Sequence, residues 1–135
     1  MALFRRKPID PARAAVLRGF EPFGAAVEAA QQALLRAVPT FRDDGIAIGF
    51  ALAAFTEHLD EAERALAHWD ASPDITARCG EAIRDAREEA TKLRLEPNAL
   101  VFEALNGRIG DILFPLETVA DIETELREAL RRSRP

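Results

Sequence analysis

Two histidines and a glutamate share one face of an expected helix and are the strongest candidates for chemistry. His58, Glu61 and His68 lie at offsets of 0, 3 and 10 residues, which places them within roughly 80° of each other around an α-helix. Imidazole and carboxylate groups bind transition metals. However, the chain has only two His and lacks the paired Glu-x-x-His motifs of di-iron bundles. A metal-binding bundle is therefore the alternative function, and no catalytic residue is assigned.

The aromatic and sulfur side chains are expected to belong mainly to a core. Cys79 lies on an apolar helix face between Ile75 and Ala82, so we expect a small buried hydrophobe with no disulfide. Trp69 comes near a helix end, where we expect a half-exposed interface anchor. The phenylalanines at helical spacing either fill a core or line a pocket for an apolar ligand, and this pocket is the second form of the alternative function. The members of this set are Phe20, Phe23, Phe41, Phe50, Phe55, Phe102 and Phe114.

Two short motifs resemble binding loops but have simpler structural interpretations. Asp43 and Asp44 precede Gly45, and we expect them to cap the next helix. Residues 106–111 resemble a phosphate-binding loop, yet they follow a helix and lack the Lys-Ser or Lys-Thr that the loop requires. We expect Gly107 and Gly110 to permit a close helix contact or a helix break.

The composition is that of a single all-α domain spanning residues 1–135. Apolar residues make up 48% of the 135-residue chain, with 26 Ala, 7 Gly and no Tyr. Alanine is the best helix former, whereas strands favour aromatic and β-branched residues. The formal charge of −5 disfavours nucleic acid as a partner, because phosphate contacts need a basic face.

The two ends of the chain differ in charge from its acidic middle. Residues 1–20 carry five basic side chains and one acidic side chain, a net +4, and three more Arg lie within the last five residues. We expect a loose basic leader over 1–9 and a loose basic tail over 132–135. The longest mostly apolar run, 46–55, has about ten residues, whereas a membrane span needs about 20. A soluble cytoplasmic protein without a transmembrane segment is therefore expected.

Apolar residues recur every three or four positions, which predicts helices throughout the chain. The expected helices cover 11–19 and 22–37, then a helix with its apolar seam from 48 to 69, one that starts at 73 and is broken at 97–98, and two over 99–113 and 115–132. Pro22 and Pro115 either break or kink the first and last long elements. Short connections favour antiparallel neighbours, so the prediction is an up-and-down bundle of four to six helices.

The apolar run over 46–55 indicates the leading function. It is apolar on all sides, so it is expected either at the centre of the bundle or in an oligomer interface. The sequence therefore predicts a small self-associating interaction module, expected to be a homodimer without catalytic activity or cofactor. Phe50→Glu and Leu52→Glu are each expected to give a folded monomer. The candidate interface residues are Ile46, Phe50, Leu52 and Trp69.

Overall fold

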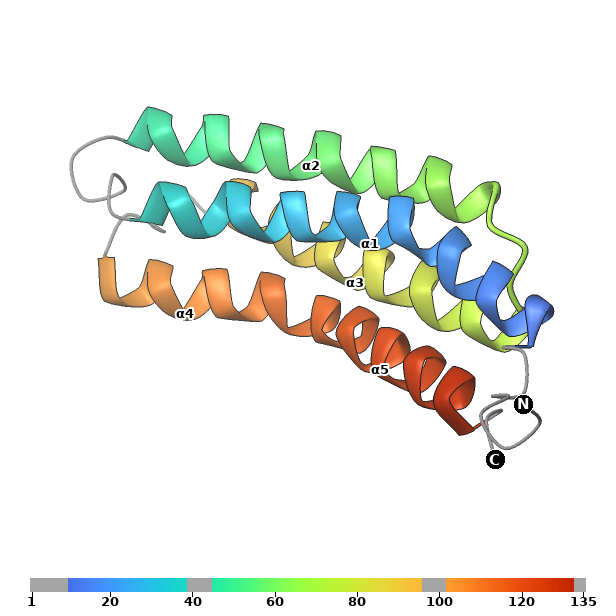
Figure 1. Cartoon of the computed structure of the whole chain (residues 1–135). Coiled ribbons are helices and arrows are strands. Elements are labelled where there is room, and N and C mark those ends of the chain that lie inside the picture. The colour runs from blue at the N-terminus through green and yellow to red at the C-terminus, as the bar shows by residue number, and fades with distance from the viewer. Residues whose placement is uncertain (1–9, 39–44, 96–101, 133–135) are drawn as a thin grey trace, which may run out of the picture.

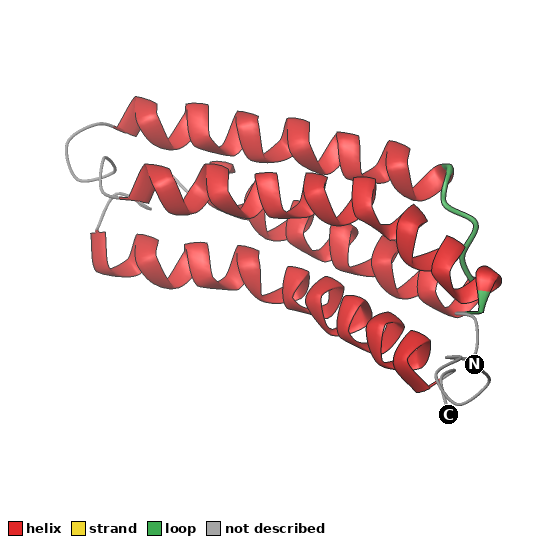
Figure 2. Ribbon diagram, viewed as in Figure 1, coloured by secondary structure: helices red, strands yellow, loops and turns green. Residues whose placement is uncertain are grey.

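Four long helical elements lie side by side, and the chain reverses direction between them (Figure 1). The computed structural model describes residues 10–38, 45–95 and 102–132, and it assigns no strand within these ranges (Figure 2). The predicted leader, the loop over 39–44 with its two Asp, and residues 133–135 lie outside them. The elements are α1 (Pro11–Ala37), α2 (Gly45–Ala67), α3 (Pro73–Leu95), α4 (Phe102–Leu113), the 3₁₀ turn η3 (Phe114–Leu116) and α5 (Glu117–Arg132).

The arrangement is the predicted up-and-down bundle. Helix α1 packs on α2 and on α5, while α3 packs on α2 and on the last element, α4–η3–α5. The two ends of the described chain meet, because the Arg13 Nη1 donates a 2.8 Å hydrogen bond to the Ala129 carbonyl. The helix starts follow the sequence rules: Asp10 accepts from the amide of Ala12 at 2.9 Å, and Ser72 accepts from that of Ile75 at 3.3 Å.

Proline affects the first and last elements differently. Helix α1 continues through Pro22, so of the two alternatives the break between 19 and 22 does not occur. Pro22 is exposed, and on that face water can hydrogen-bond the carbonyl that its missing N–H leaves free. At Pro115 the α-helix gives way to η3, and α4 and α5 form one bent element (Figure 1).

Gly107 and Gly110 neither break α4 nor bring another helix close, contrary to the expectation from sequence. Helix α4 runs through both of them to Leu113. Both are exposed, and a Cβ built on either would meet no atom within 4 Å. Their spacing of three residues places them together on the wet side of the helix.

The core runs the length of the bundle and is formed by apolar side chains that recur every three or four positions along the helices. Phe23, Phe55, Leu59, Ile112 and Ile122 are all 0% exposed. Among the described residues, no polar or charged side chain is buried. Burial of apolar area is the main source of stability in such a core.

Ion pairs on the surface connect α3 to its neighbours. Arg87 pairs with Asp60 and Glu63 of α2, the latter at 2.9 Å. Arg78 binds Glu125 of α5 through two hydrogen bonds of 2.8 and 2.9 Å. Since exposed ion pairs contribute at most about 1 kcal/mol each, they set the alignment of the helices more than the stability of the fold.

Trp69 is a core residue and does not form the expected half-exposed anchor. Its side chain is 7% exposed, and the indole Nε1 donates a 2.9 Å hydrogen bond to the Val16 carbonyl of α1. The ring contacts Phe20 edge-on at 5.6 Å and stacks on Phe23 at 6.0 Å. Gly19 makes room for it, because a Cβ there would lie only 2.8 Å from the indole Nε1. Trp69 therefore joins the α2–α3 turn to α1 within one chain.

Candidate functional site

The predicted metal-binding face of α2 does not assemble into a site. The Nδ1 of His58 lies 3.6 Å from a Glu61 carboxylate oxygen. His68 lies beyond the end of α2 at Ala67, in an exposed turn. Within the described ranges, no three His, Cys, Asp or Glu side chains are grouped so that they could hold a metal ion. The reason is the rise of the helix. Ten residues of helix advance the chain by about 15 Å, so His58 and His68 can share a face and still lie far apart along the axis.

Cys79 is the buried hydrophobe that the sequence predicts. It lies in α3, its side chain is 0% exposed, and it forms no disulfide. Burial raises the pKa of its thiol to about 11, although the nearby charge of Arg78 opposes the rise. The thiolate is the nucleophilic form of cysteine, so this thiol is not arranged for catalysis in the folded chain.

The raised pKa of Cys79 predicts a loss of stability at alkaline pH. Above the pKa of the unfolded thiol, near 9.0, the unfolded chain ionises while the folded chain keeps its proton. Stability is therefore lost progressively from about pH 9 to about pH 11. The difference in unfolding free energy between the wild type and Cys79→Ala, measured in urea, is expected to shrink over this range. A constant difference would contradict the assignment, since the other titrating groups are common to both proteins.

The phenylalanines do not gather around a ligand pocket. Phe23 and Phe55 are fully buried, and Phe20 is 4% exposed against Trp69. Phe50 and Phe114 point outward. Phe41 lies outside the described residues, as does the side chain of Phe102. Three of the phenylalanines at helical spacing therefore belong to the core, and two, Phe50 and Phe114, lie on the surface.

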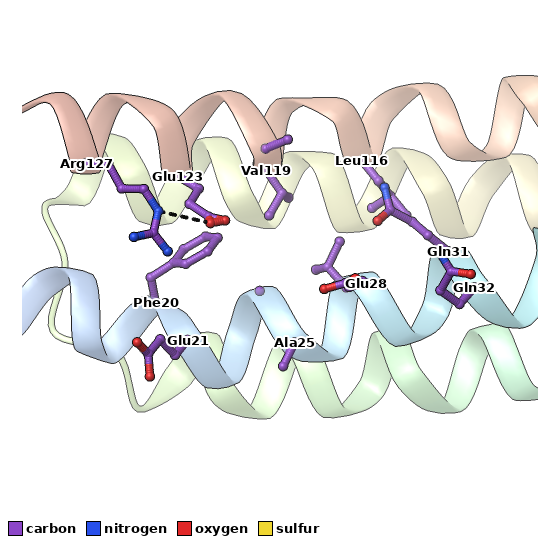
Figure 3. A pocket seen from close by; sticks show the side chains of 13 residues that line it. Phe20, Glu21, Ala25, Glu28, Gln31, Gln32, Leu116, Val119, Glu123 and Arg127 are labelled. Atoms are coloured by element: carbon purple, nitrogen blue, oxygen red, sulfur yellow. Dashed lines mark ion pairs between the residues drawn. The ribbon is translucent and has the colours of Figure 1, made fainter.

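A surface groove of about 440 Å³ lies between α1 on one side and η3 and α5 on the other. Figure 3 shows Arg127 and Glu123 extending from α5 toward Phe20 of α1, and these two charged side chains form an ion pair at 3.5 Å. The floor of this groove is formed by apolar side chains that are at most 4% exposed, namely Phe20, Val27, Leu116 and Val119. The other polar lining residues are Glu21, Glu28, Gln31 and Gln32.

The groove offers hydrogen-bonding and charged groups, and its only ionisable side chains are carboxylates and one guanidinium. None of its 13 lining residues is Ser, Cys, His or Lys. Gln31 and Gln32 are the only glutamines of the chain, and both lie at this groove. The arrangement can hold a polar or cationic group against a narrow apolar floor, and it supplies no recognisable pair for acid–base catalysis.

The first half of α2 presents an apolar outer face. Phe50 is 73% exposed, and Gly49 and Ala53 beside it are exposed as well. Leu52 is 1% exposed, so the bundle of a single chain already covers it and it is not available as an interface residue. Ile46 lies in α2, and its side chain is outside the described residues. Of the four candidate interface residues, Phe50 is the one that the structure places on the surface.

Two exposed apolar side chains were missed by sequence analysis. Phe114 is 71% exposed at η3, and Leu35 is 48% exposed near the end of α1. Leu35 follows the buried Leu34 directly, so its side chain points about 100° around the helix from that apolar position. That spacing was the available signal for Leu35. For Phe114, the signal was its position midway between Ile112 and Leu116, which are four residues apart and share the buried side, so that Phe114 falls off the apolar stripe.

Comparison with known proteins gives no indication of function, so a proposal of function rests on the fold and on the surface of the bundle. Neither the models of protein families, nor the curated proteins, nor the solved structures include a match to this chain. None of the described helices combines the length and the apolar character that crossing a bilayer requires.

Proposed function

We propose that this protein is a self-associating helical interaction module whose copies meet through the first half of α2. The observation that carries the proposal is the 73% exposure of Phe50 on the outer side of that helix. A phenylalanine ring of this exposure leaves a large apolar area in water, and aromatic side chains are typical anchors at the centres of interfaces.

The chemistry of this face favours a second copy of the chain as the occupant. Residues 45–56 contain no charged side chain, and Glu57 is the first on α2. In a two-fold dimer, the same patch meets itself, so a face without charge meets no like-charge repulsion. The small residues Gly49 and Ala53 next to Phe50 allow a partner helix to approach closely.

Phe50→Glu tests this proposal because it places a charge at the expected contact without touching the core. We expect the wild type to be dimeric by light scattering at micromolar concentration, and Phe50→Glu to be a monomer with an unchanged helical circular dichroism spectrum. The introduced carboxylates would face each other across the two-fold axis and lose their water.

Phe114→Glu is the matched control, since Phe114 is 71% exposed and lies on another part of the bundle. It should leave the dimer intact. A wild type that stays monomeric at all concentrations, or a Phe50→Glu variant that dimerises as the wild type does, would contradict the proposal.

A further inference from the structure

The second exposed aromatic ring, Phe114, lies in a surface groove between α3 and the η3–α5 segment. The groove has a volume of about 310 Å³, and Phe114 and Pro115 line it from η3. Phe114 is 71% exposed, so its ring face is accessible to a partner. Because this groove belongs to α3, η3 and α5, it is separate from the α2 face proposed above for self-association.

Carboxylates line both walls of the groove. Glu81 and Asp85 lie along α3, whereas Glu117 and Asp121 lie along α5. A spacing of four residues in each pair directs both members to the same side of their helix. The groove therefore presents an exposed aromatic ring together with two short rows of negative charge.

The charges already present in the groove are unevenly neutralised. Arg78, at one end, is held by the two hydrogen bonds to Glu125, and this pairing keeps the pKa of the Glu125 carboxyl below its usual value. Arg84 of α3 reaches Glu81 at 3.3 Å and Asp85 at 3.7 Å.

The carboxylates on the α5 side differ, because Glu117 and Asp121 have no ion pair or side-chain hydrogen bond with any residue that the structure describes. Two unneutralised carboxylates thus stand beside the exposed ring.

We propose that this groove binds an arginine-bearing peptide segment of a protein partner. A guanidinium stacks on an aromatic face and at the same time donates hydrogen bonds in its own plane to carboxylates, which a lysine ammonium does less well. Here the Phe114 ring supplies the face, and Glu117 and Asp121 supply the unpaired acceptors one and two turns away.

Charge argues against a second copy as the occupant of this groove. A two-fold contact through it would bring Glu117 and Asp121 of each chain close to the same carboxylates of the other. The groove is open and follows two helices, which suits an extended segment carrying several cations rather than a single small ion.

The test uses the full-length protein and fluorescein-labelled hexa-arginine, with binding followed by fluorescence anisotropy at low salt. We expect saturable binding that weakens as salt is raised. Phe114→Ala should raise the Kd by about 3- to 10-fold, the range that a stacked cation on an aromatic ring corresponds to. The double variant Glu117→Gln/Asp121→Asn should raise it by a similar factor. Hexa-lysine should bind the wild type more weakly than hexa-arginine.

A matched variant separates this site from general attraction to an acidic protein. Glu57→Gln/Glu61→Gln removes the same charge from α2. It should leave the Kd within about 2-fold of wild type. The proposal is overturned if hexa-arginine does not bind, if Phe114→Ala binds as the wild type does, or if the α2 charge pair matters as much as the groove pair. All substituted side chains are exposed, and thermal melting verifies that each variant folds.

Discussion

Replacing Trp69 with alanine is expected to lower the free energy of unfolding by about 3–5 kcal/mol, the usual cost of removing a large buried aromatic side chain. The indole is 7% exposed and contacts both Phe20 and Phe23 of α1. Because small domains have only about 5–15 kcal/mol of stability, this single change removes a large part of it. Urea unfolding followed by far-ultraviolet circular dichroism measures the loss without relying on tryptophan fluorescence.

Two further variants separate the parts of this contact. Trp69→Phe keeps an aromatic ring but loses the hydrogen bond to the Val16 carbonyl, so we expect a smaller loss, which includes about 1 kcal/mol for that bond. Gly19→Ala places a methyl group against the indole and should cost about 1–3 kcal/mol by overpacking.

Gly107→Ala is the control for Gly19→Ala, because a Cβ there meets nothing within 4 Å. It should stabilise the protein by up to about 1 kcal/mol through helix propensity. If Gly19→Ala stabilised the protein as Gly107→Ala does, Trp69 would not lie on Gly19 in solution.

Leu52→Glu is expected to unfold the protein or to cost about 4 kcal/mol or more, in contrast to the folded monomer predicted from sequence. Leu52 is 1% exposed, so its replacement removes a core side chain and forces a carboxylate into an apolar interior. Phe50→Glu, two residues earlier, should change the unfolding free energy by less than about 1 kcal/mol, because Phe50 is exposed.

Thermal and urea unfolding of the two glutamate variants side by side gives the measurement. A stable, helical Leu52→Glu protein would show that this part of α2 faces outward in solution. The dimerisation experiment therefore relies on Phe50→Glu alone. That variant is expected to lose the interface and keep the fold, whereas Leu52→Glu is expected to lose the fold itself.

The local character of the chain could be predicted from its sequence, because it depends on contacts between residues close in the chain. Apolar residues every three or four positions and the burial of Cys79 appear in the structure as predicted. The caps at Asp10 and Ser72 follow the ordinary residue preference of helix N-termini. The up-and-down arrangement followed from the short connections between long helices.

Other features depended on which face of each helix meets another helix. The run 46–55 is apolar on all sides, so the sequence left both Phe50 and Leu52 as interface candidates, and only the packing of the bundle decided that Leu52 is buried and Phe50 exposed. For the same reason, Trp69 was predicted to be an anchor in an interface with a partner, although it packs on Gly19 of its own chain. His58 and His68 share a face in projection but are separated along the helix axis.

The sequence by itself therefore determined the helices, their caps and the apolar positions that form the core, since these follow from spacing along one chain. Only the tertiary structure decided which apolar side chains remain exposed, which carboxylates stand unpaired beside Phe114, and where α1 and α5 leave a groove. The physical reason is that exposure and pairing depend on neighbours far away in the sequence, and a helical pattern specifies a face without specifying what covers it.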